Sequence, residues 1–176
     1  FEKIIAYLKK KSEALVIDQM NNPGGSLFYL YALLSHLSEK PLRAPKESAT
    51  ITQEDVSQAL DLYASLEGLE TDSEVRAAFG DTVEGYRVTA ELAGSLKHFC
   101  KFIIKEWEKG KLMTSPYPLF GIENIEPHPF TRYKKPILVL VNSLDFSCAD
   151  LFPAILQDNN RAVIFGAKTA GAGGYI

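Results

Sequence analysis

Two short segments of the sequence carry residues that could perform chemistry on a carbonyl group. Ser147, in F-S-C-A-D, stands where a strand and loop pattern gives way to a helix pattern. N–H groups and the positive dipole end at a helix N-terminus stabilise negative charge, so this position suits a nucleophile. The segment N-N-P-G-G ends in Gly24 and Gly25. Adjacent glycines let the backbone approach a ligand closely and turn N–H groups outward, as an oxyanion hole requires.

Both segments also have ordinary structural interpretations. Residues 21–25 could be a helix-initiating turn. Ser147, with Asp150 three residues later, matches a capping box. Ser143 competes with Ser147 for the strand end, and Cys148 has no nearby histidine to activate it, so a packed thiol is expected there.

The other chemistry-bearing residues give weaker patterns. His36, His98 and His128 are expected to be structural or exposed, because a lone histidine without a spaced partner is seldom catalytic. No His and Cys spacing predicts a metal site. The glycine-rich residues 166–174 match neither the phosphate-loop nor the dinucleotide-binding pattern, so no cofactor is expected.

The hydrophobic pattern places the two segments at the ends of buried strands. Residues 14–18 and 136–142 are continuous apolar runs of strand length, and 161–166 predicts a third strand. A loop and a helix follow each of the first two, at 26–38 and 147–159. Strands alternating with helices predict an α/β domain with largely parallel strands, in which ligands gather at the carboxyl ends of the strands.

Residues 41–135 interrupt this pattern with a mainly helical insertion. Thr52 and Asp55 resemble a capping box at the start of one helix, and residues 83–109 have helical spacing with Gly110 as the stop. Proline-rich residues 112–135 predict extended, turn-rich backbone.

Both ends of the chain lie close to predicted secondary structure. Residues 3–10 predict a short helix, and residues 173–176 predict a glycine turn that leads into a further strand. The 176 residues are therefore expected to be a piece of a larger protein.

Composition excludes several classes of function. The formal net charge of −3, from 19 basic and 22 acidic side chains, gives no overall attraction for nucleic acid or anionic lipid. The longest apolar runs are far below the roughly 20 residues that span a membrane, so neither nucleic acid nor a membrane is an expected partner. Two cysteines cannot form a disulfide framework.

The order and spacing of the motifs resemble the tail-specific (C-terminal processing) serine protease family, which shares the crotonase/ClpP-like spiral fold. Residues 14–25 match as a strand followed by N-N-P-G-G. Residues 136–174 match as a strand, F-S-C-A-D, a helix, a strand and G-x-x-T-x-G. The likeness continues through the insertion in P-L-F-G at 118–121 and P-H-P at 127–129. The resemblance implies that residues 1–176 are a C-terminal-type catalytic protease domain fragment, with a spiral α/β core that carries the large helical insertion at 41–135.

Carried over residue by residue, the resemblance makes Ser147 the acyl-forming nucleophile of a serine endopeptidase. It places the oxyanion donors at the backbone N–H of Cys148 and of Gly24 or Gly25, and the two glycines stay open as alternatives. The implied reaction is acyl transfer: the Ser147 hydroxyl attacks a peptide carbonyl while N–H groups hold the tetrahedral oxyanion.

The sequence lacks the general base expected for one branch of the family. The Ser/Lys branch has its lysine after G-x-x-T-x-G, where this sequence reads A-G-G at 172–174, and Lys168 lies four residues too early. The alternative is a Ser-His-Glu arrangement, with the histidine from upstream of Phe1 and the glutamate from downstream of Ile176. The fragment alone is then expected to be inactive.

The resemblance also implies partners and location. We expect protein or peptide substrates, association with the remaining pieces of the same protease after self-cleavage, homodimerisation, and export by an intracellular bacterium into the host cytosol, where host proteins are cleaved. Two alternatives remain: a crotonase-like acyl-CoA enzyme that uses the same oxyanion loops, and a non-catalytic scaffold or interaction module in which Ser147 only caps a helix.

Overall fold

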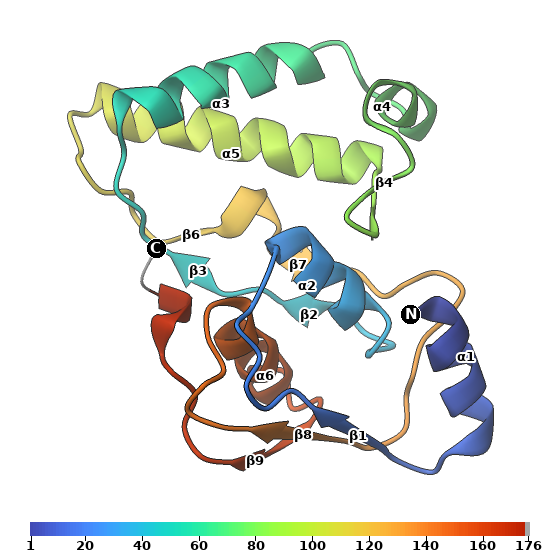
Figure 1. Cartoon of the computed structure of the whole chain (residues 1–176). Helices are drawn as coiled ribbons and strands as arrows, with labels where there is room; N and C mark the ends of the chain where they lie inside the picture. The colour runs from blue at the N-terminus through green and yellow to red at the C-terminus, as the bar shows by residue number, and fades with distance from the viewer. Residues whose placement is uncertain (175–176) are drawn as a thin grey trace. The chain divides into compact units, whose positions relative to one another are not determined.

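The structure is a computed structural model that describes residues 1–174, and it has the α/β architecture expected from the sequence (Figure 1). Its α-helices are α1 (Glu2–Lys11), α2 (Leu27–Ser35), α3 (Gln53–Leu66), α4 (Asp72–Phe79), α5 (Ala90–Glu108) and α6 (Cys148–Asp158). Its strands are β1 (Leu15–Asp18), β2 (Leu42–Arg43), β3 (Lys46–Glu47), β4 (Thr82–Val83), β5 (Tyr86–Arg87), β6 (Tyr117–Pro118), β7 (Asn124–Ile125), β8 (Ile137–Val141) and β9 (Val163–Gly166). Short 3-10 helices are η1 (Leu119–Gly121) and η2 (Ala172–Gly174).

The chain divides into two compact units. The sheet unit contains residues 1–43, 84–86 and everything described from 124 onward. The helical unit contains residues 44–83 and 87–123. The strand predicted after residue 174 lies outside the described residues.

The sheet unit is built on a parallel three-stranded sheet of order β1-β8-β9. Ile17, Val139 and Ile164 form one row across it. Val139 is fully buried, and its neighbours two residues away on β8 are also buried, as predicted. The prediction of a buried strand is wrong for β1, because one of its faces is open and Val16 is 58% exposed. Figure 1 shows the three strands side by side with α6 next to them. This register places the carboxyl ends of β1 and β8 next to each other, where the two predicted loops begin.

The helical unit packs α3 against α5 (Figure 1). Its two apolar clusters are centred on Ile51, Ala59, Cys100 and Ile103, and on Leu66, Val75, Val88 and Ala93. The predicted capping box is confirmed, because the Thr52 side chain accepts from the Asp55 N–H while the Asp55 carboxylate accepts from the Thr52 N–H.

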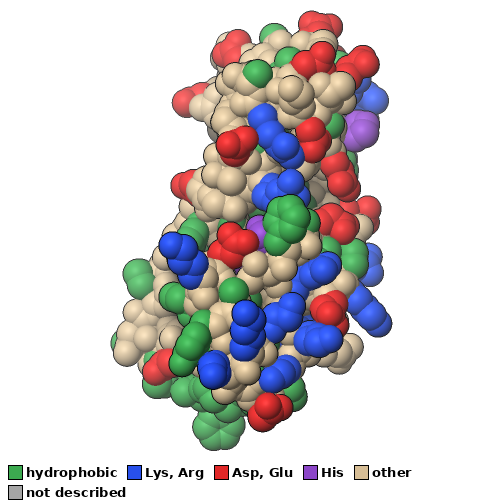
Figure 2. Space-filling view, turned by 90° about the vertical axis from the view of Figure 1, so that its right-hand side faces the viewer, with side chains coloured by type: hydrophobic (Ala, Val, Ile, Leu, Met, Phe, Trp, Pro, Cys, Tyr) green, Lys and Arg blue, Asp and Glu red, His purple; other side chains and the backbone are tan. Residues whose placement is uncertain are grey.

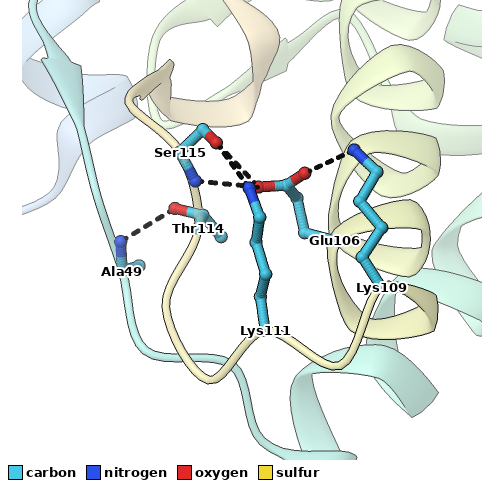
Figure 3. A network of polar contacts seen from close by, with 6 residues as sticks. All are labelled: Ala49, Glu106, Lys109, Lys111, Thr114 and Ser115. Carbon is cyan, nitrogen blue, oxygen red and sulfur yellow. Dashed lines mark hydrogen bonds and ion pairs between the residues drawn. The ribbon is translucent and has the colours of Figure 1, made fainter.

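A polar network closes the end of α5 (Figure 3). The carboxylate of Glu106, only 2% exposed, accepts hydrogen bonds from Lys109 Nζ at 2.8 Å and Lys111 Nζ at 2.6 Å. The backbone N–H and the hydroxyl of Ser115 complete its shell, each at 2.9 Å. Such a buried carboxylate is stable because both of its oxygens accept hydrogen bonds and two of the donors are cationic.

One predicted boundary is wrong. The helix predicted from residue 83 begins only at Ala90, because Glu84 and Gly85 adopt φ values of 49° and 86° and form a turn before it. Val88 is buried like the apolar residues of α5 and continues their spacing, although it lies before Thr89, the N-cap of the helix. Helix α4 was not predicted. Gly110, at φ 73°, ends α5 as expected.

The surface carries both signs of charge. Figure 2 shows a face on which acidic and basic side chains are interspersed with exposed hydrophobic ones, in keeping with the formal net charge of −3. No helix within residues 1–174 is long and apolar enough to cross a membrane.

Candidate active site

Ser147 occupies the N-cap position of α6 with an unusual backbone. Its φ of 58° and ψ of −120° lie outside the regions that a residue with a side chain normally adopts. Within the described chain its side chain makes no capping hydrogen bond to α6. Non-glycine residues held in this way cost of order 1–3 kcal/mol and cluster at functional sites. The hydroxyl is therefore placed at the helix tip without the ordinary structural use of a capping serine.

Asp150 has a different partner from the one that a capping box requires. Its carboxylate, 9% exposed, accepts from the N–H groups of Gly171, Ala172 and Gly173 at 2.8, 3.1 and 3.0 Å. The capping-box interpretation of Ser147 and Asp150 is thus wrong: the carboxylate holds the glycine-rich segment after β9 beside the tip of α6. A Cβ added to Gly173 would lie 3.3 Å from the Ser147 carbonyl oxygen.

The double-glycine bend lies directly against the Ser147 segment. A Cβ added to Gly24, whose φ is +90°, would lie 2.5 Å from the Phe146 carbonyl oxygen and 3.0 Å from both Cys148 N and Ser147 Cβ. Only glycine fits such an approach. The structure therefore brings Gly24, Ser147 and Cys148 together. Gly25 follows in the chain, is exposed, and has no atom within 4 Å of the position its Cβ would take.

A buried carboxylate joins the loops after β1 and β8. Asp145 has 0% exposure. Its Oδ1 accepts from the Asn22 N–H at 3.1 Å, and its Oδ2 accepts from the Asn142 N–H at 2.9 Å and from Gln19 Nε2 at 3.2 Å. The Phe146 N–H donates to the Asn22 carbonyl at 2.9 Å. These bonds fix the two predicted site segments relative to each other.

A proline in α6 adds a second link. Pro153 has no N–H, so the Ala149 carbonyl four residues earlier lacks its helical donor. Gln19 Nε2 supplies that hydrogen bond at 2.7 Å. The residue that follows β1 is in this way tied to the first turn of the helix that carries Ser147.

The two glycines differ in their backbone hydrogen bonds. The Gly24 N–H donates to Asn22 Oδ1 at 2.9 Å. Within residues 1–174, the Gly25 N–H donates no hydrogen bond. Gly25 is consequently the glycine whose N–H can serve a ligand in this arrangement.

A cavity of about 180 Å³ opens beside the bend. Gly24, Gly25 and Cys148 form part of its wall, and apolar side chains form much of the remainder. The principal apolar side chains are Tyr29, Leu30, Leu33 and Phe152. The lining of the cavity suits an apolar group of a ligand.

The histidines have structural partners. His36 is 8% exposed, its Nδ1 lies 2.8 Å from the Thr131 carbonyl oxygen, and its ring stacks on His128 at 4.1 Å. His98 is exposed on α5, and Lys168 is exposed after β9. Among the residues that the structure describes, no hydrogen bond joins a histidine or Lys168 to Ser147, and no cluster of His, Cys, Asp or Glu could hold a metal ion.

Comparison with known proteins decides the family. The model for peptidase family S41 matches residues 1–176. The chain belongs to peptidase family S41. The match confirms the family predicted from the two loop motifs, and it places the Ser147 segment and the double-glycine bend inside an S41 domain.

Chlamydial proteins are similar over the whole chain. A protein of Chlamydia trachomatis serovar D is 51% identical and one of Chlamydia pneumoniae 45% identical, both over 177 residues. These matches cover all of this chain but 30% and 29% of the relatives, so the chain spans about a third of their length.

Two solved structures superpose closely on this chain. The crystal structure of mature CPAF, the chlamydial protease-like activity factor, is 51% identical with a TM-score of 0.94, over 97% of this chain and 33% of that one. Mature CPAF complexed with lactacystin is 52% identical with a TM-score of 0.95, over 99% of this chain and 34% of that one.

Proposed function

We propose that this chain is the nucleophile-bearing part of a serine endopeptidase. The observation that carries the proposal is the contact between the Gly24 backbone and the tip of α6, where Ser147 has a positive φ and a hydroxyl not used for capping. Membership of family S41 supports a peptide as the substrate. The alternative, a scaffold in which Ser147 only caps a helix, is not supported, because the Ser147 side chain makes no capping hydrogen bond to α6.

The proposed chemistry is acyl transfer. The Ser147 Oγ attacks the peptide carbonyl carbon, its proton passes to a general base, and the carbonyl oxygen becomes an oxyanion. The N–H of Cys148, in the first turn of α6, and the N–H of Gly25 are proposed as the oxyanion donors. Removal of one such donor typically slows the reaction about a hundred- to a thousandfold.

The base is proposed to come from the rest of the protease. Lys168 is exposed, and within residues 1–174 no titratable side chain is hydrogen-bonded to the Ser147 hydroxyl. A Ser-His-Glu arrangement, with both partners outside residues 1–176, therefore fits better than a Ser/Lys dyad. The fragment by itself is proposed to be inactive, because an unactivated serine is a weak nucleophile.

The wider biology is proposed from similarity to chlamydial proteins. It comprises cleavage of host proteins after export from an intracellular bacterium into the host cytosol, self-cleavage into associated pieces, and homodimerisation. A crotonase-like spiral core is proposed on the same basis.

Peptide hydrolysis by the complete protease tests the proposal. Ser147→Ala should abolish turnover, while Ser143→Ala, at the competing strand-end serine, should leave kcat within about twofold, because Ser143 is exposed and its side chain makes no hydrogen bond within residues 1–174. Turnover by the purified 176-residue chain alone, or undiminished turnover by S147A, would count against the assignment.

A further inference from the structure

The turn formed by Glu84 and Gly85 touches the helix that follows the double-glycine bend. Glu84 and Gly85 lie between β4 and β5 with positive φ values, as a two-residue hairpin turn requires. Although the neighbouring chain belongs to the helical unit, residues 84–86 group with the sheet unit. This short tip is therefore part of the structure around the candidate site.

The tip meets α2 through a hydrogen bond and through aromatic rings. The Glu84 carboxylate accepts a hydrogen bond from the Ser26 hydroxyl. Gly85 lies near the same helix, since a Cβ added to it would be 3.6 Å from the Ala32 Cβ. The Tyr86 ring lies 6.1 Å from Phe28 and 6.2 Å from Tyr31, measured between centroids. The apolar contacts fix the tip on α2, and the Glu84 bond fixes its end at the first residue after Gly25.

Ser26 is the N-cap of α2, yet its hydroxyl makes no capping bond to its own helix within the described chain. It donates instead to Glu84. The negative carboxylate lies at the positive end of the α2 dipole, which favours this arrangement. The side chain of Ser26 is thereby held from outside the helix, in a single direction.

Gly25 depends on its neighbours for its orientation. It has no side chain, and nothing packs against its Cβ position. On one side the Gly24 N–H is held by Asn22, and on the other Ser26 is held by Glu84. A glycine peptide free to turn would direct its N–H away from a substrate carbonyl for part of the time.

We infer that Glu84 is a positioning residue for the oxyanion hole: through Ser26 it holds the peptide of Gly25 in the direction that binds the developing oxyanion. This inference rests on the proposed protease function. Glu84 itself does not touch the substrate, so its contribution should appear in kcat rather than in KM, because an oxyanion forms only after attack.

Kinetics of the complete protease test the inference with four variants and one control. Glu84→Ala and Ser26→Ala should each lower kcat about tenfold with KM within about twofold, a smaller loss than that of a whole oxyanion donor. Because the two act through one bond, the double variant should be no slower than either single variant. Glu84→Gln keeps an acceptor oxygen and should retain nearly full kcat. Glu91→Ala, at an exposed glutamate on α5, is the matched control.

Unchanged kcat in E84A, equal losses in E84Q and E84A, or a rise in kcat when the charge is removed would each overturn the inference. Failure of the proposed function is distinguishable from these results. In that case S147A would keep its activity or the unaltered complete protease would have none, whereas failure of the Glu84 inference leaves a Ser147-dependent protease intact.

Discussion

Gly24 and Ser147, 123 positions apart in the sequence, are close enough that a Cβ on Gly24 would lie 3.0 Å from that of Ser147. The parallel pairing of β1 with β8 brings the ends of these strands together, and Asp145 fixes the loops that follow. A strained serine at a helix tip and a glycine backbone in contact with it are what the acyl-transfer proposal requires.

Gly24→Ala should destabilise the protein and abolish most activity. The added Cβ would meet the Phe146 carbonyl oxygen at 2.5 Å, and φ of +90° disfavours alanine, so a loss of about 1–3 kcal/mol or more is expected. Gly25→Ala is the matched control for folding, since no atom lies within 4 Å of its Cβ position. Thermal unfolding of the two variants checks the difference, and equal melting temperatures would contradict the close approach.

Ser147 substitutions should have small effects on stability. Since the hydroxyl does not cap α6, Ser147→Ala should change the free energy of unfolding by less than the roughly 1 kcal/mol typical of a lost cap. Ser147→Gly should be more stable than S147A, because relief of positive φ is worth about 1–2 kcal/mol before the entropy cost of glycine. Denaturant titration measures both. A cap-sized loss in S147A would restore the helix-cap interpretation.

Asp145→Ala should separate the two loops. Loss of the buried carboxylate leaves the Asn142 N–H without its acceptor, at about 1–3 kcal/mol for an unsatisfied group, and leaves the Asn22 N–H only the Gln19 carbonyl of its own loop. Amide hydrogen exchange of residues 19–25 and 142–147 in the complete protease should rise. Asp158→Ala, at an exposed carboxylate at the end of α6, provides the comparison. Unaltered exchange in D145A would show that the link is dispensable.

Glu106 should make the helical unit sensitive to acid. Hydrogen bonds from Lys109, Lys111 and Ser115 lower the pKa of the Glu106 carboxyl well below its ordinary value (Figure 3). A carboxyl whose folded pKa is lowered contributes stability above its unfolded pKa of about 4.3, and loses that contribution as pH falls toward the folded value. Protection of α5 amides in the complete protease should therefore decline below about pH 5.

In Glu106→Gln, the α5 amides should be less protected from hydrogen exchange at pH 7 than in the unaltered protein. Their protection should also depend less on pH in the acid range. Glu108→Gln, an exposed neighbour on α5, should behave as the unaltered protein does. If E106Q kept the full acid dependence, another group would have to be responsible.

The local hydrophobic pattern of the sequence was enough to predict the strands and helices that carry the candidate site. The aliphatic runs that became β1 and β8, and the helices after them, follow from hydrophobic periodicity. The helix start at residue 83 was wrong because buried Val88 fits helical spacing although a turn precedes it. Helix α4 is only eight residues long and was missed, although Thr71 and Glu74 form a capping box that marks its start.

The polar links could not be predicted because their partners are distant in sequence. Asp145 is joined to Asn22, and Asp150 to the segment at residues 171–173. For Asp150 the tertiary bonds displaced the local capping box that the sequence favoured. One signal was present: Pro153 within a helix pattern leaves the Ala149 carbonyl for an outside donor, which proved to be Gln19.

Mapping of a covalent adduct tests the central claim most directly. The complete protease, treated with a fluorophosphonate probe and digested, should carry the adduct on Ser147, and S147A should carry none there. The isolated 176-residue chain should remain unlabelled, because its serine lacks a base. An adduct on Ser143 or another residue, with Ser147 unmodified in an active protease, would contradict the assignment of the nucleophile.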